Sequence, residues 1–177
     1  RKELNRLILG LAVVEILDKS TLESNPFPVL YRLGWRILEK MDDKNLNFWL
    51  VFTFFLYQLS LRIGFMPNLQ QCSKCNVDLA ASSFDDCIGE LVCMDCVTQS
   101  KIYLGENSLT FLRKMEKLHL DELCTLSVIN NGMENSIRFL ESYISFHVVG
   151  TKKIKSMEMV CQLLNEKKNY CNEISIY

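Results

Sequence analysis

Apolar residues recur with a helical period along the first part of the chain. Across residues 2–18 the apolar positions that set this period are Leu4, Leu7, Ile8, Leu11, Val14 and Ile16. Side chains three and four residues apart share one side of an α-helix, so this segment predicts an amphipathic helix with its apolar face in the core. A second helix is predicted after Asn25, which can cap it, with Pro26 at its first position. Its apolar positions are Val29, Leu30, Leu33, Ile37, Leu38 and Met41.

The most apolar run of the chain lies at Phe48–Tyr57. A membrane span needs about 20 apolar residues, and polar residues flank this shorter run, so we expect a buried core helix over residues 46–63. Gly64 tolerates the left-handed conformation with which many helices end. We also expect the two tryptophans of the chain, Trp35 and Trp49, in the core.

The pattern changes between residues 70 and 98, where cysteines, turn residues and short strand-like pieces replace the helical period. Beyond this segment, apolar residues again predict helices at about residues 109–118, 133–148 and 155–164. The expected fold class is therefore mainly α: a helical bundle interrupted by a small cysteine-rich segment with short β-hairpins. We divide the chain into a first helical part (1–69), an insertion (70–98), a second helical part (99–165) and a frayed tail (166–177).

The composition is that of an ordinary folded domain. Of the 177 residues, 49% are hydrophobic and 23% are charged, which excludes a disordered chain, a collagen-like repeat and a disulfide miniprotein. The 20 Lys and Arg against 21 Asp and Glu give a net charge of -1, which excludes a strongly basic nucleic-acid binder on bulk electrostatics. The first residue is Arg1 and a helical pattern starts at once, so we expect a fragment of a longer protein.

Four of the eight cysteines form two closely spaced pairs. Two residues separate Cys72 from Cys75, and two residues separate Cys93 from Cys96. This spacing allows one tight turn to present both sulfurs of a pair to the same ion, and the spacer between the pairs is long enough for a β-hairpin that brings them together. The spacing therefore predicts a zinc ribbon, in which one zinc ion is held by all four thiolates in a reducing compartment.

The predicted zinc is structural. Four thiolates fill a tetrahedral coordination sphere, which leaves no position for a reactive water. The two histidines of the chain, His119 and His147, are far from the cysteines in sequence. The insertion has few apolar residues, so the metal would supply much of its folding free energy. Two alternatives stay open: Cys87, between the pairs, as a substitute ligand, and a redox role for a C-x-x-C pair.

Candidate binding residues lie outside the insertion, because residues 72–98 carry only Lys74 against five acidic residues. Two clusters are candidates for DNA or acidic-peptide binding: Arg138, Lys152, Lys153 and Lys155, and separately Arg32, Arg36 and Arg62. Arginine pairs with a carboxylate in a bidentate manner, so the second cluster, on helices with apolar faces, suits an acidic, hydrophobic peptide end. For both clusters, ordinary solvated surface charge is the alternative.

Several motifs together resemble a known family. Residues 61–75 read Leu-Arg-x-Gly-x-x-Pro-x-Leu-x-x-Cys-x-x-Cys, and the second cysteine pair follows Gly89, Glu90, Leu91 and Val92. Near the end of the chain stand Arg138, Leu140, Tyr143, Lys155 and Ser156. This order of features resembles the C-terminal region of the RecO family of bacterial DNA repair proteins, over nearly the whole chain.

The resemblance implies an α-helical domain interrupted by a zinc ribbon, which follows an N-terminal OB-fold that this chain lacks. The four paired cysteines match the zinc ligands of the family, and its basic Lys-Ser segment matches Lys152, Lys153, Lys155 and Ser156. Members act in recombinational repair in the bacterial cytoplasm, associated with the nucleoid, and are not enzymes in the strict sense. They bind single- and double-stranded DNA, the acidic C-terminal tail of the single-strand binding protein, and RecR.

The resemblance therefore implies a mediator that anneals complementary strands and assists recombinase loading, with DNA bound mainly through the missing OB-fold and with no membrane partner. A helical protein-interaction scaffold with a structural zinc and no DNA binding is the alternative. A zinc-dependent or thiol-redox enzyme is a third hypothesis, for which the sequence offers no further catalytic motif.

Overall fold

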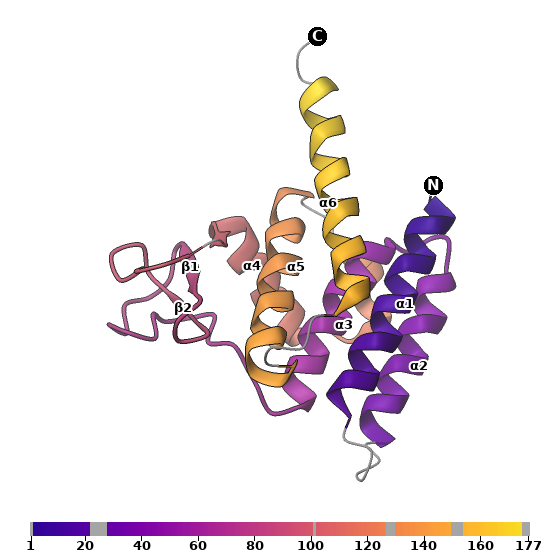
Figure 1. Cartoon of the computed structure of the whole chain (residues 1–177), viewed down its shortest axis with the longest axis horizontal. Helices are drawn as coiled ribbons and strands as arrows, with labels where there is room; N and C mark the ends of the chain where they lie inside the picture. The colour runs from indigo at the N-terminus through magenta and orange to yellow at the C-terminus, as the bar shows by residue number, and fades with distance from the viewer. Residues whose placement is uncertain (1, 22–27, 101, 127–129, 150–153, 175–177) are drawn as a thin grey trace.

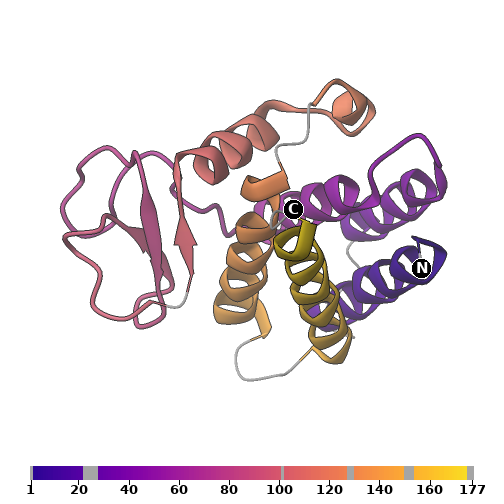
Figure 2. The same ribbon diagram turned by 90° about the horizontal axis from the view of Figure 1, so that it is seen from above.

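The computed structural model describes residues 2–21, 28–100, 102–126, 130–149 and 154–174. It is mainly helical, with a small sheet at one side of the helices (Figures 1 and 2). The helical elements are α1 (Lys2–Ser20), α2 (Pro28–Asp42), α3 (Phe48–Arg62), α4 (Glu106–Lys117), η1 (Leu120–Thr125), α5 (Asn130–Ile144), η2 (Ser145–Val149) and α6 (Lys155–Ile174). The strands are β1 (Ser82–Asp85), β2 (Glu90–Val92) and β3 (Tyr103–Leu104). This architecture confirms the expected fold class.

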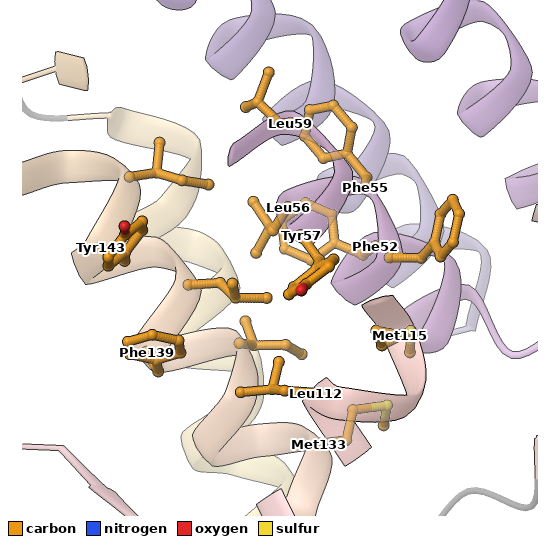
Figure 3. Close-up of a cluster of buried hydrophobic side chains, with 14 of the residues drawn as sticks. Phe52, Phe55, Leu56, Tyr57, Leu59, Leu112, Met115, Met133, Phe139 and Tyr143 are labelled. Carbon is orange, nitrogen blue, oxygen red and sulfur yellow. The ribbon is translucent and has the colours of Figure 1, made fainter. Parts of the chain in front are cut away.

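Helix α3 forms the centre of the core and contacts α1, α2, α4 and α5. Its aromatic side chains, such as Phe52, Phe55 and Tyr57, are fully buried (Figure 3). The Oδ1 atom of Asn47 caps the start of the helix by accepting a hydrogen bond from the Trp49 amide at 3.0 Å. The expectation of a core helix is thus confirmed. Within the part of the chain that the structure describes, no helix has the length and apolarity of a membrane span.

Helix α1 buries a face that agrees only in part with the predicted one, since Ile8 and Ile16 are buried as expected. Its buried side chains are Ile8, Leu9, Ala12, Val13 and Ile16, whereas Leu4, Leu7, Leu11 and Val14 are exposed. Apolar residues occur on both sides of this helix, so periodicity alone does not show which side meets the core. The expectation for Trp35 is also wrong, because its side chain is 64% exposed on the outer side of α2. Trp49 is buried as expected.

The helix ends differ in part from the predictions. Helix α5 continues into the π-helical turn η2, and α6 runs to Ile174 rather than ending near residue 164. The last part of α6 is polar, so it lacks the apolar positions that reveal a helical period. The proposed start signal at Asn25 and Pro26 and the last part of the predicted tail, residues 175–177, lie outside the described residues.

The small sheet has the strand order β2-β1-β3, and both pairings are antiparallel. Strands β1 and β2 form the predicted hairpin between the cysteine pairs, whereas β3 was not predicted. Phe84 of β1 contacts the rings of Phe139 and Tyr143 of α5 edge-on, with centroid distances of 5.8 and 6.5 Å. On the other flank, the Arg113 guanidinium of α4 donates hydrogen bonds to the carbonyl oxygens of Leu69 and Leu79. Helices α4 and α5 therefore hold the ribbon, residues 70–98, against the helical bundle.

Candidate metal centre and basic cleft

The four paired cysteines meet at one point of the ribbon. The Sγ atoms of Cys72, Cys75, Cys93 and Cys96 all lie within 4.8 Å of one another, and the Sγ atoms of Cys75 and Cys93 are 3.7 Å apart. A tetrahedral site with metal–sulfur bonds of about 2.3 Å separates its sulfurs by about 3.8 Å. The arrangement therefore fits a metal ion bound by four thiolates. Cys87 is exposed and is not part of this group.

Local hydrogen bonds shape the two turns that present the sulfurs. The Cys72 sulfur accepts hydrogen bonds from the backbone amides of Lys74 at 3.4 Å and Cys93 at 3.2 Å, so it is in contact with both cysteine pairs. Asn76, directly after the first pair, closes its turn with a φ of 60° and an amide that donates to the Cys72 carbonyl. Asparagine is one of the few residues that adopt this conformation readily.

The electrostatics of the four sulfurs suit a cation. Burial opposes ionisation of Cys72, but amide donors, the Cys93 amide first among them, outweigh it and lower the pKa of Cys72 to about 6. Hydrogen bonding to Cys93 and Cys75 raises the pKa of Cys96 to about 12. Four sulfurs this close cannot all carry a negative charge without a cation among them. A divalent metal ion would displace their protons and stabilise all four thiolates.

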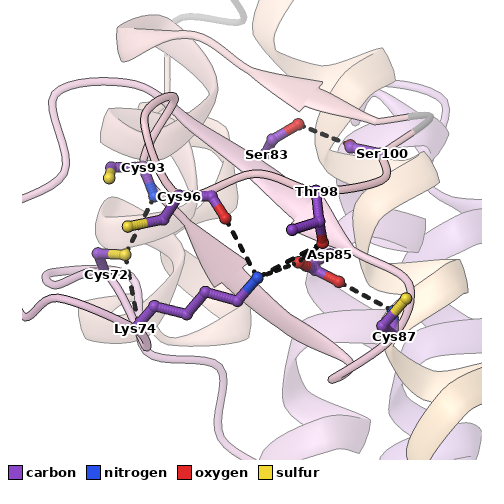
Figure 4. Close-up of polar contacts among 9 residues, drawn as sticks. All are labelled: Cys72, Lys74, Ser83, Asp85, Cys87, Cys93, Cys96, Thr98 and Ser100. Carbon is purple, nitrogen blue, oxygen red and sulfur yellow. Dashed lines mark hydrogen bonds and ion pairs between the residues drawn. The ribbon is translucent and has the colours of Figure 1, made fainter.

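A second polar network, which the sequence analysis did not identify, joins the ribbon strands to the cysteine turns (Figure 4). The Lys74 ammonium lies 2.7 Å from Oδ2 of Asp85, whose side chain is completely buried. Thr98 donates a hydrogen bond to the same oxygen at 2.9 Å, and the Cys87 amide donates to Oδ1 at 3.0 Å. The hydrogen bond from Lys74 holds the pKa of Asp85 down at about 2. The one sequence signal for this network is that Lys74 is the only basic residue among residues 72–98.

The arginine cluster on α2 and α3 forms the basic side of one cleft. Arg32, Arg36 and Arg62 line this cleft, which has a volume of about 690 Å³. Its apolar walls come from α2, α3 and the segment around η1, and consist of Val29, Leu33, Phe54, Leu61, Leu118 and Leu120. Further polar lining residues that the sequence analysis missed are Gln58, Glu116, Lys117, His119 and Asp121. Gln58 lies four residues before Arg62 on α3. The others come from a segment distant in sequence, so no local motif connects them with the arginines.

The charges within the cleft are only partly paired. Arg36 lies 3.0 Å from Asp121, and the same carboxylate lies 2.8 Å from Lys40. Arg62 donates a hydrogen bond to the Gln58 carbonyl at 3.0 Å. Burial, together with the positive charge of Arg36, lowers the pKa of Arg62. Within the described ranges, Arg32 has no ion pair or hydrogen bond. A carboxylate entering this cleft would therefore meet cations that repel each other and are incompletely neutralised.

The structure describes two members of the other predicted cluster, Arg138 and Lys155. Arg138 lies 3.1 Å from Glu134 and donates a hydrogen bond to Asn165 at 2.6 Å, so its guanidinium is engaged within the helical bundle. Lys155 has an exposed side chain at the start of α6. Lys152 and Lys153 lie outside the described residues.

Fold and site together define a class: a helical domain with a four-cysteine metal-binding ribbon and a separate basic, apolar-walled cleft. Comparison with known proteins identifies the family. The model of the family described as "Recombination protein O C terminal" matches residues 1–158. The chain belongs to this family, as its motifs indicated.

Curated bacterial relatives agree with this assignment. The chain is 27% identical over 145 residues to the DNA repair protein RecO of Syntrophomonas wolfei, covering 80% of this chain and 57% of the relative. It is 26% identical over 176 residues to the protein of the same name from Pelobacter propionicus, covering 95% and 66%. The RecO protein of Listeria monocytogenes is 25% identical over 152 residues, covering 82% and 59%. The chain thus spans less than two thirds of the length of these relatives.

Proposed function

We propose that this chain is the adaptor part of a recombinational repair mediator, and that it binds the acidic C-terminal tail of the single-strand binding protein. The observation that carries the proposal is the convergence of Arg32, Arg36 and Arg62 on one cleft with apolar walls. In such a cleft the carboxylates of an acidic peptide end can pair with guanidinium groups, while an apolar side chain contacts the walls. Binding of this kind needs no catalytic group, and the proposed role is not enzymatic.

Family membership supports a wider role for the whole protein. The relatives are named DNA repair proteins, and we propose that the whole protein binds single- and double-stranded DNA, promotes annealing, assists recombinase loading and associates with RecR in the bacterial cytoplasm. The net charge of this chain is -1, so phosphate binding within it would need a local patch. The cluster of Arg138, Lys152, Lys153 and Lys155 is the candidate patch.

We further propose that the four paired cysteines hold one structural zinc ion. The support is the chemistry of four thiolates and the 3.7 Å separation of the Cys75 and Cys93 sulfurs. Bound zinc would supply four bonds that connect the two cysteine turns. The ribbon has few apolar side chains, so hydrophobic packing alone could not replace these bonds. The ribbon in turn contacts the helical bundle through Phe84 and Arg113.

A helical interaction scaffold that binds protein partners but no DNA is the second candidate. The specific observation in its favour is the slight acidity of the chain. The two candidates make the same claim about the cleft and differ only in whether this chain has affinity for nucleic acid.

Fluorescence anisotropy with two labelled probes tests both claims. One probe is an acidic C-terminal peptide of a bacterial single-strand binding protein, and the other is an unstructured oligonucleotide. We expect the peptide to bind, with an affinity that falls as salt increases from 50 to 200 mM. The variant Arg62→Ala should weaken peptide binding at least about tenfold, because a hydrogen-bonded charged pair contributes roughly 1.5–3 kcal/mol. Lys44→Ala removes the same charge from an exposed side chain outside the cleft lining and serves as the matched control.

The two probes give separable results. Peptide binding that Arg62→Ala weakens and Lys44→Ala leaves unchanged supports the adaptor role. Oligonucleotide binding that is lost on replacing Lys152, Lys153 and Lys155 by Glu supports the DNA role of this chain, with a reduced salt slope as its electrostatic signature. Peptide binding without oligonucleotide binding favours the scaffold for this part of the protein. If the peptide does not bind at 50 mM salt, the proposed use of the cleft is wrong.

A further inference from the structure

Lys74 has an unusual position for a charged surface residue. It is the only basic residue among residues 72–98, which carry five acidic residues, and it stands between the cysteines of the first pair. Its ammonium contacts Oδ2 of Asp85 at 2.7 Å, the Cys96 carbonyl at 3.1 Å and the Thr98 hydroxyl at 3.5 Å (Figure 4). An ammonium group has three protons, so these three acceptors use its full capacity. The Lys74 side chain of the first cysteine turn is therefore hydrogen-bonded to the segment that carries the second cysteine pair.

Asp85 completes this arrangement from the end of β1. Its side chain is fully buried, and both oxygens have donors: Lys74 and Thr98 on Oδ2, and the Cys87 amide on Oδ1. A buried carboxylate is costly to desolvate unless it is paired and hydrogen-bonded. The ribbon tolerates this group because its partners come from both sides of the hairpin. Asp85 thereby fixes Lys74 of the first turn and Thr98 beyond the second turn to one strand.

The contacts of Lys74 and Asp85 do not depend on metal–sulfur bonds. They join the two cysteine turns through nitrogen and oxygen atoms, so the turns have a second connection besides the ion. The ammonium also brings a positive charge to the cysteine turns. A divalent ion with four thiolates has a net charge of -2, and a nearby cation lowers the electrostatic cost of that charge.

We propose that Lys74, Asp85 and Thr98 form a positioning clamp, which holds the two cysteine turns at metal-binding separation and slows the release of the metal. The three residues are positioning residues and not metal ligands. This inference rests on the proposed metal site. It predicts that loss of the clamp changes how long the site keeps its metal, even where the helical bundle stays folded.

The test measures the rate of zinc transfer from the purified chain to an excess of a chromogenic chelator at constant pH. We expect Lys74→Met and Asp85→Asn each to increase the release rate at least tenfold. Thr98→Val should increase it less, because it removes two neutral-hydroxyl hydrogen bonds but no charge. Asp86→Asn is the matched control, since Asp86 is an exposed neighbouring carboxylate. Circular dichroism at the same temperature should show unchanged helix content in all variants.

Two further readouts separate positioning from general structural support. With Co²⁺ in place of zinc, Lys74→Met should shift or broaden the absorption bands that report tetrahedral thiolate ligation, whereas Asp86→Asn should not. The release rate of Lys74→Met should also depend more strongly on ionic strength than that of the unmodified chain, because loss of the ammonium leaves Asp85 unpaired and makes the charge around the thiolates more negative. Thr98→Val should keep the original salt dependence.

The possible failures are distinguishable. If the unmodified chain takes up no zinc or Co²⁺, the proposed metal site is wrong and the clamp is wrong with it. If the unmodified chain holds one ion and the Lys74→Met and Thr98→Val variants release it at the rate of Asp86→Asn, the metal site stands and the clamp is wrong. Should Asp85→Asn fail to fold, Lys74→Met and Thr98→Val still decide the question.

Discussion

The cleft geometry makes an unusual prediction: removal of one carboxylate should tighten the binding of an acidic peptide. Asp121 lies at the edge of the cleft and pairs with both Arg36 at 3.0 Å and Lys40 at 2.8 Å. An incoming carboxylate must compete with Asp121 for the Arg36 guanidinium. The variant Asp121→Asn keeps the size and polarity of the side chain but removes this competitor.

The size of the effect follows from the charges that line the cleft. The cleft lining contains four cationic side chains, those of Arg32, Arg36, Arg62 and Lys117, and the two carboxylates of Glu116 and Asp121. With His119 neutral, the formal charge of the lining is therefore +2, and Asp121→Asn raises it to +3. Asp121 is 63% exposed, so water and salt screen its pairs and the gain is limited to roughly two- to fivefold in Kd. The gain should be larger at 50 mM than at 200 mM salt.

Anisotropy titration with the acidic peptide measures this change at both salt concentrations. The control is Asp86→Asn, which makes the same change in net charge on the ribbon, outside the cleft lining. Equal or weaker binding by Asp121→Asn, or an equal gain in Asp86→Asn, would refute the idea that carboxylates compete for the cleft arginines.

Three other changes probe the ribbon and the helical bundle. Cys93→Ser removes one of the four sulfurs, and hydrogen exchange should show loss of protection in residues 70–98 before the helices; simultaneous loss in both parts would contradict a ribbon that depends on metal. Phe84→Ala leaves a cavity between β1 and α5 and should lower the free energy of unfolding in urea by about 3–5 kcal/mol. A loss below about 1 kcal/mol would show that this contact does not hold the ribbon against α5. Glu15 accepts hydrogen bonds from the amides of Lys155 and Ser156 at the start of α6, so Glu15→Ala should lower the thermal midpoint through a loss of about 1 kcal/mol, and an unchanged midpoint would argue against this cap.

The sequence could predict features whose cause is local. The two cysteines of each pair share one turn, and the run Phe48–Tyr57, apolar except for Thr53, has no stable place outside a core. The cysteine cluster and α3 were therefore predictable. The face of α1 was not, because apolar residues surround it and only its tertiary neighbours select the buried side. The same holds for Trp35, which is exposed although tryptophan is usually well buried.

Long-range polar contacts were beyond sequence reasoning for a different reason. The arginines were candidates from their place on apolar helices, but Lys117, His119 and Asp121 join them only through the packing of α4 and η1 against α3. Likewise, nothing in the spacing of Lys74 and Asp85 distinguishes a buried ion pair from two solvated charges. Charged residues have no periodic signature of burial, so only the fold can identify such pairs.

Helix α4 connects the cysteine ribbon to the cleft, and so links the ribbon physically to the proposed binding site. At one point along α4, Arg113 donates hydrogen bonds to the carbonyl oxygens of Leu69 and Leu79, which flank the first cysteine pair. At its end, Glu116 and Lys117 line the cleft and lead directly into the wall residue Leu118. When the ribbon is folded, the carbonyl oxygens of Leu69 and Leu79 have fixed positions. Their hydrogen bonds then hold the Arg113 guanidinium, and with it the end of α4, in place. The ribbon contributes no residue to the cleft lining, yet we infer that its fold helps to position one wall of the cleft.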